Sequence, residues 1–185
     1  MLDSTGLNTE QVLKHCFEYC NRNDVKHVVV ASTSGHTGAL ASEINHNQYN
    51  GKFNLVVVTH CKGFREPNKD ELEPSNAEKI KKYGGKIHTG TMVFHNINDA
   101  FRAKNYLSDL TVVADTLRMM GQGTKVAVEI VLMAADAGLI PVKREVFAIA
   151  GTGVGADTGL LILAENSRRA LKLKIKDVVI KPKEW

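Results

Sequence analysis

Two short runs of aliphatic residues constrain the fold of this chain more than any other feature. They are Lys26–Ala31, which contains three consecutive valines, and Leu55–Thr59, which contains three more. Apolar runs of this length, without polar alternation, are typical of strands buried on both faces of a sheet. Between them, residues 36–49 carry Leu40, Ala41 and Ile44 at helical spacing. A strand, a helix and a second buried strand indicate a right-handed crossover between parallel strands.

The rest of the chain continues this alternation. Further helices are predicted at 9–23 and 75–83 and within 98–138, and further strands at 86–89, 145–150, 160–164 and 171–180. We therefore predict a single α/β domain over residues 1–185, a three-layer sandwich around a mainly parallel sheet. Asn98, Asp109 and Thr124 are predicted to cap helices. The Leu-Lys alternation after residue 170 predicts a half-exposed strand near the sheet edge.

The charge of the chain is distributed unevenly. The formal net charge is +4, but residues 165–185 hold seven basic and three acidic side chains, which leaves 17 of each sign in residues 1–164. A neutral body argues against nucleic acid as a partner. No apolar run approaches the roughly 20 residues that span a bilayer, and the N-terminal residues lack a secretory pattern. We expect a cytoplasmic protein without membrane contact, in which three cysteines form neither a disulfide framework nor a metal site.

The loop after the first buried strand is the sharpest functional signal. It contains Ser32, Thr33, Ser34, Gly35, His36 and Thr37. Free backbone N–H groups and the helix dipole favour an anion at the start of the following helix, and the hydroxyl groups add further donors. These residues are predicted to bind a phosphate group. The alternative interpretation is an ordinary helix cap with a tight turn.

Other candidate ligand contacts follow the remaining strands. They are Thr59, His60, Gly63 and Phe64 after the second strand, Thr89 after the third, and Gly151, Thr152 and Gly153 after the fourth. A dinucleotide-binding glycine motif lies between a strand and a helix, whereas this glycine-rich segment leads into a strand. We therefore do not interpret it as such a motif. We predict that it forms a second wall of the pocket. The long polar segment 60–73 is a candidate lid.

Two acidic residues stand out in the apolar helix predicted at 126–137. Glu129 and Asp136 lie seven residues apart, and hence on one helical face. Two interpretations remain open: contacts to a ligand, or structural ion pairs such as the one that Lys125 can form with Glu129.

Several segments resemble a known family. The segments Val28–Ala39, Leu55–Thr59 and Glu145–Gly151 resemble the C-terminal α/β domain of pyruvate kinase. Residues 116–130, 133–138 and 151–158 resemble a group of stand-alone, mostly archaeal proteins of that fold.

The resemblance implies a pyruvate kinase C-terminal-domain-like fold, with Thr33, Ser34, Gly35 and Thr37 as phosphate contacts. It does not imply pyruvate kinase activity, because the family's chemistry takes place in a β/α barrel for which 185 residues leave no room. His36 stands where the family often has a basic residue, so specificity for a sugar bisphosphate is not carried over.

Three functional hypotheses follow. The first is binding of FMN, or a similar phosphorylated ligand, through the Ser32–Thr37 loop. The second is a regulatory module that binds a sugar phosphate or nucleotide without catalysis. The third is a hydrolase or lyase that uses His36 or His60, although spacing alone identifies no base–nucleophile pair. A homo-oligomer built through the apolar helices is also predicted.

Overall fold

The computed structural model describes residues 1–184, so the last residue of the predicted domain lies outside the described part of the chain. The strands are β1 (Leu2–Asp3), β2 (His27–Ala31), β3 (Asn54–Thr59), β4 (Lys86–Thr89), β5 (Glu145–Ala150), β6 (Thr158–Leu163) and β7 (Lys174–Lys181). The helices are α1 (Thr9–Arg22), α2 (His36–Tyr49), α3 (Pro74–Lys82), α4 (Ile97–Arg102), α5 (Asp109–Arg118), α6 (Gln122–Asp136) and the 3-10 helix η1 (Ser167–Lys172).

Within residues 1–184 the strands form one sheet in the order β1-β7-β6-β5-β2-β3-β4. The pairs β1–β7, β5–β2, β2–β3 and β3–β4 are parallel, whereas β5–β6 and β6–β7 are antiparallel. The predicted mainly parallel α/β sheet is therefore confirmed, with its antiparallel pairs confined to the C-terminal strands.

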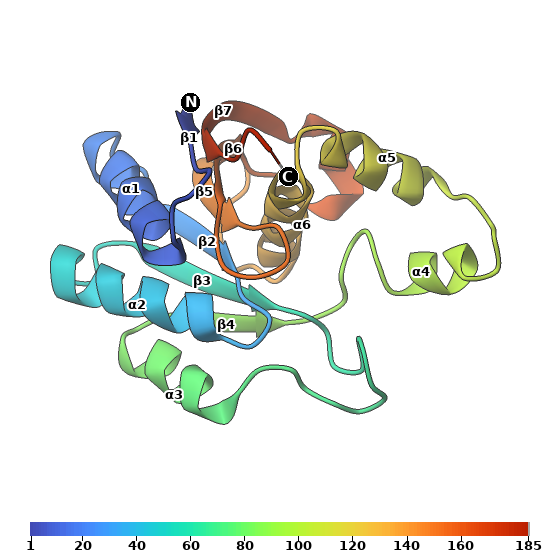
Figure 1. Ribbon diagram of the computed structural model, residues 1–185, viewed down its shortest axis with the longest axis horizontal. Coiled ribbons are helices and arrows are strands. Elements are labelled where there is room, and N and C mark those ends of the chain that lie inside the picture. Colours follow the sequence, from blue (N-terminus) through green and yellow to red (C-terminus); the bar gives the residue numbers. More distant parts are fainter. Residues whose placement is uncertain (185) are drawn as a thin grey trace.

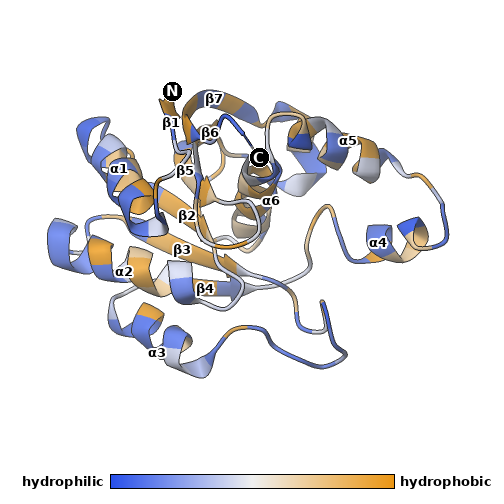
Figure 2. Cartoon of the chain, in the orientation of Figure 1, coloured by the Kyte–Doolittle hydropathy of each residue, from blue (hydrophilic) through white to orange (hydrophobic). Residues whose placement is uncertain are grey.

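Helices cover both faces of the sheet, as Figure 1 shows. Val28 and Val30 of β2 pack with the apolar residues of α1 and α2, while Val29 between them packs with α6. This division follows from the strand period of two, which sends successive side chains to opposite faces. Figure 2 shows the same central strands as the apolar interior of the molecule. The predicted three-layer arrangement is thus confirmed.

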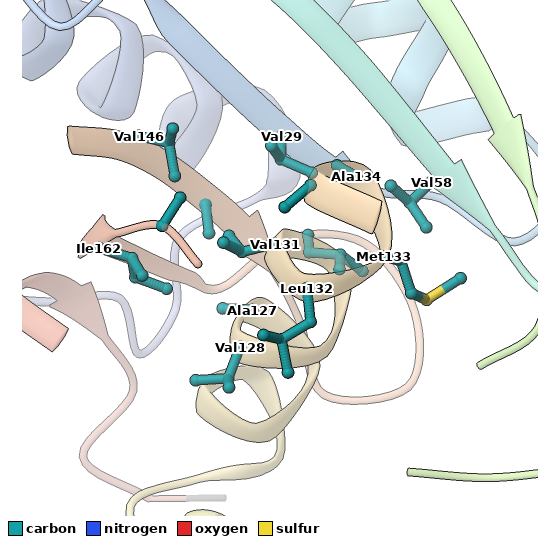
Figure 3. Close-up of a cluster of buried hydrophobic side chains, with 14 of the residues drawn as sticks. Val29, Val58, Ala127, Val128, Val131, Leu132, Met133, Ala134, Val146 and Ile162 are labelled. Atoms are coloured by element: carbon teal, nitrogen blue, oxygen red, sulfur yellow. The ribbon is translucent and has the colours of Figure 1, made fainter. Parts of the chain in front are cut away.

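Helix α6 fills the core on its side of the sheet. Val131 and Leu132 are fully buried, and Figure 3 shows them among side chains from β2, β5 and β6. Each such side chain contributes about 1.5–3 kcal/mol by leaving water. The burial agrees with a helix that is apolar nearly all round.

The structure differs from the sequence predictions mainly at element boundaries. The predicted C-terminal strand begins as the 3-10 helix η1, and β7 starts only at Lys174. Its predicted position near the sheet edge is confirmed, because only the two residues of β1 pair on its outer side. The helices α4, α5 and α6 begin after Asn96, Ser108 and Gly121, rather than at the predicted caps Asn98, Asp109 and Thr124.

In the described part of the chain, none of the helices combines the length and the apolar character needed to cross a membrane.

Candidate functional site

The strand order creates a crevice between β2 and β5. From β2 the chain moves outward through β3 to β4, and then returns to β5 on the opposite side of β2. In open α/β sheets, ligands bind at such a reversal, beyond the carboxyl ends of the strands. A pocket of about 940 Å³ lies here, lined by the loops that follow β2, β3 and β5 and by one side of α6.

Most of the predicted contacts line this pocket. They are Ser32, Thr33, Ser34, His36, Thr37, Thr59, His60, Phe64, Gly151 and Gly153. These residues come from three loops that are far apart in the sequence. The sequence assigns each of them to the end of a particular strand, and the fold brings the three strand ends together around one pocket.

Four of the predicted residues do not line the pocket: Gly35, Gly63, Thr89 and Thr152. Gly35 instead allows the turn into α2, with φ of +88°. A Cβ atom there would lie 2.6 Å from Leu72 Cδ1, so only glycine permits the close approach of the neighbouring segment. The hydroxyl of Thr89 lies 2.6 Å from that of Thr59, and Thr152 N–H donates to Asp157.

The backbone N–H groups of residues 33–37 have no hydrogen-bond acceptor among the described residues. The next N–H, that of Gly38, donates to Ser32 Oγ over 3.0 Å. The N-cap residue of α2 is Gly35, which has no side chain to accept a hydrogen bond from residues 36 and 37. Unsatisfied donors at a helix start concentrate positive potential, and therefore favour an anionic oxygen.

His60 connects the second loop to the first. Its Nε2 lies 3.2 Å from Thr33 Oγ1, and its Nδ1 lies 2.8 Å from Glu71 Oε2. The other carboxylate oxygen of Glu71 forms an ion pair with Arg65, whose Nε lies 3.2 Å away. The ring of Phe64 lies 4.3 Å from that of His60. Glu71 and His60, both in the long polar segment 60–73, therefore connect this segment to Thr33 in the loop after β2.

A second polar cluster forms at the α6 wall. Glu129 is 2% exposed and accepts hydrogen bonds from Lys125 Nζ over 2.5 Å and from Phe94 N–H over 2.7 Å. His95 Nδ1 lies 3.1 Å from the same carboxylate. Burial alone raises the pKa of Glu129, but the bonds from His95, Lys125 and Phe94 outweigh it and hold that pKa below its usual value.

The two open interpretations of the acidic residues on α6 resolve differently. Glu129 forms the expected ion pair with Lys125 and also lines the pocket, so its contact with a ligand stays a prediction. Asp136 is exposed, and it accepts the backbone N–H of Ser167 over 3.0 Å, which is a structural role. The two side chains have different environments, because Glu129 lies in the buried part of α6 and Asp136 is the exposed last residue of this helix.

Sequence reasoning missed Glu71 and His95, which complete these two clusters. Neither has a spacing signal: Glu71 lies eleven residues from His60, and His95 lies 34 residues from Glu129. Cys61 does not pair with His60, and instead accepts a hydrogen bond from Asn96 over 2.9 Å. Across residues 1–184, no three His, Cys, Asp or Glu side chains are grouped so that they could hold a metal ion.

No protein-family model matches the chain. A pyruvate kinase from Cryptosporidium parvum is similar in structure, with a TM-score of 0.39 and 14% identity over 77% of this chain and 20% of that chain. Cryptosporidium parvum pyruvate kinase in complex with ADP gives a TM-score of 0.40 and 14% identity, over 83% of this chain and 22% of that one. The chain thus spans about a fifth of these proteins. A likeness at this level transfers neither activity nor ligand, and a relation to stand-alone archaeal proteins stays a prediction.

Proposed function

We propose that this protein binds a small phosphorylated ligand, with the phosphate group held by the backbone N–H groups of residues 33–37. The observation that carries the proposal is the run of unsatisfied N–H donors at the start of α2, on the wall of the pocket. Such donors hold anions without any net positive charge nearby. Two acidic side chains of the pocket wall already have basic partners, since Glu71 is paired with Arg65 and Glu129 with Lys125.

FMN is the ligand that we favour. Its phosphate would bind the N–H groups of the loop, and its flat ring requires a broad and partly apolar cavity. The volume of about 940 Å³ lies at the upper end of the range for small-molecule sites. Phe64, Met92 and Met133 supply apolar surface, and Gly151 allows close approach of the backbone. When bound, a flavin supplies redox chemistry, while the residues of this chain orient it.

A regulatory module that binds a sugar phosphate or a nucleotide is the alternative, because the same N–H groups would accept any terminal phosphate. The apolar wall built by Phe64, Met92 and Met133 favours a ligand with a flat ring over a bare sugar phosphate. Fructose bisphosphate, AMP and ATP are therefore the competing ligands in the experiment.

The test is a fluorescence titration of the purified protein with FMN, and with riboflavin, which lacks the phosphate. We expect FMN to bind and riboflavin to bind at least tenfold more weakly, because it cannot use the loop. Ser34→Asp should abolish the difference, since a carboxylate then competes for the same donors. The matched control is Ser75→Asp, which places the same charge on an exposed residue in the first turn of α3.

Two results would contradict the proposal. One is equal affinity for FMN and riboflavin, which would remove the loop from the site. The other is an absence of binding by FMN and by all three competing ligands. Tight binding of a competing ligand in place of FMN would keep the phosphate site and assign the regulatory alternative.

A further inference from the structure

The strand-to-helix turn after β2 has the residue spacing of a nucleophile elbow. In that arrangement a nucleophile sits on a sharp turn between a strand and a helix, with small residues two positions before and after it. Here Thr33 occupies the turn, Ala31 ends β2 two residues earlier, and Gly35 precedes α2 two residues later. The positive φ that such a turn requires falls on Gly35 rather than on Thr33.

A base and an orienting group face this hydroxyl. Thr33 Oγ1 lies 3.2 Å from Nε2 of His60, and the opposite ring nitrogen lies 2.8 Å from Glu71. A carboxylate at Nδ1 fixes the tautomer in which Nε2 accepts a proton, which is the role of the acidic residue in a Ser-His-Asp triad. The side chain of Glu71 is 11% exposed and that of His60 is 25% exposed. The relay formed by Thr33, His60 and Glu71 is therefore largely shielded from solvent but open to the pocket.

The donors for an oxyanion are already present. A tetrahedral intermediate needs N–H groups next to the nucleophile, commonly including that of the following residue. The N–H of Ser34 follows Thr33, and it has no acceptor within residues 1–184. The hydroxyl of Thr33, the imidazole of His60 and the carboxylate of Glu71 are thus in contact on the pocket wall, which Ser34 also lines.

We propose that Thr33, His60 and Glu71 form a nucleophilic triad that hydrolyses small carboxylic esters. The Thr33 oxygen attacks the carbonyl carbon, and its proton passes to His60 Nε2. The carbon–oxygen bond to the leaving alcohol then breaks, and His60 returns the proton to that alcohol. His60 then takes a proton from water, and the resulting hydroxide attacks the acyl carbon. The bond between that carbon and the Thr33 oxygen breaks, His60 returns the proton to this oxygen, and the carboxylic acid leaves. Met92, Ile130 and Met133 on the pocket wall would accommodate an apolar acyl group.

This activity goes beyond phosphate-ligand binding and does not depend on it. A protein that binds FMN need not hydrolyse esters, and one that hydrolyses esters need not bind FMN. The two proposals are therefore tested by separate measurements.

The experiment measures hydrolysis of p-nitrophenyl acetate by the full chain. Thr33→Ala and His60→Gln should each lower kcat at least ~100-fold, as loss of a nucleophile or base does. Glu71→Gln should lower it at least ~10-fold through a misoriented imidazole. Thr33→Ser retains the hydroxyl, so it should retain activity. The controls are His88→Gln and Glu66→Gln, since neither residue lines the pocket.

A second measurement separates a covalent mechanism from a merely structural role. The reaction is quenched in acid, and the protein is mapped by mass spectrometry for an acetyl group. We expect the acetyl group on Thr33 in the wild-type protein, on the introduced serine in Thr33→Ser, and absent from this position in His60→Gln. Hydrolysis at the same rate in the wild type and in His60→Gln would overturn the proposal, as would acetylation confined to lysines. Circular dichroism confirms that each variant is folded.

Discussion

At the scale of single residues, Glu129 makes the clearest prediction about stability. Its carboxylate is buried and is held charged by Lys125, His95 and the N–H of Phe94. Removing one partner of a buried ion pair costs about 3–5 kcal/mol, because the other charge stays buried without its partner. We expect Glu129→Gln to lower the free energy of unfolding by ~3 kcal/mol at pH 7.

The same carboxylate makes that loss depend on pH. The folded pKa of Glu129 is held below its ordinary value of 4.5. A depressed carboxyl pKa contributes stability that is complete above the unfolded pKa and is lost as the pH falls through the folded pKa. The free energies of urea unfolding of the wild type and of Glu129→Gln should therefore differ most near neutral pH. They should converge below pH 4.5. The control is Glu10→Gln on the exposed face of α1. A difference that stays constant down to the lowest pH would contradict the assignment.

At the scale of elements, α2 packs unusually close to the sheet. A Cβ atom on Gly38 would lie 2.4 Å from Cγ1 of Val57 on β3 and 3.2 Å from Ile80 of α3. We expect Gly38→Ala to destabilise the protein by about 1–3 kcal/mol through overpacking, although alanine favours a helix over glycine by about 1 kcal/mol. The measurement is the free energy of unfolding in urea.

A double-mutant cycle assigns the cause of that loss. Val57→Ala removes the methyl groups that Gly38→Ala would contact, so in this background the added methyl should cost much less. An equal cost in both backgrounds would show that contact with Val57 is not the cause of the loss.

The central elements could be predicted from sequence because each carries its own signal. The valine runs of β2 and β3 can be buried only between two layers, and α2 begins at the predicted residue. The element β1 could not be predicted, because its two residues gain their structure entirely from pairing with β7. The caps of α4, α5 and α6 lie two, one and three residues before the predicted ones, and only α5 is capped by a side chain, that of Ser108.

The site could be predicted only in part from the sequence, because most of its contacts join residues that are far apart in the chain. The Ser32–Thr37 loop, the candidate phosphate site, is one continuous segment, so its composition alone marks it as a candidate. The relay joins Thr33 to His60 across 27 residues and His60 to Glu71 across eleven, and no local pattern encodes such a contact. The pocket became definable only when the strand order placed β5 beside β2.

At the scale of the whole molecule, the region of α4 and α5 leaves a large apolar surface in water. Figure 1 shows both helices beside the sheet rather than over its centre. The exposed apolar side chains are Ile97, Phe101, Tyr106, Leu107, Leu110, Val112, Val113, Met119 and Met120, and we call this set the α4–α5 surface. Exposed apolar side chains of this number are candidates for a contact site, because large apolar patches on soluble proteins mark such sites.

The predicted homo-oligomer is therefore expected to assemble through the α4–α5 surface. A stable interface buries about 800 Å² on each partner, which a surface of many large side chains can supply. Light scattering after size exclusion should give more than one chain per particle for the wild type. Leu107→Lys should shift the protein to the monomer, because Leu107 is 77% exposed within this surface and a buried lysine would oppose association. Leu171→Lys is the matched control, since Leu171 is 97% exposed but lies on η1. A wild-type monomer at every concentration, or dissociation by both substitutions alike, would contradict this assignment.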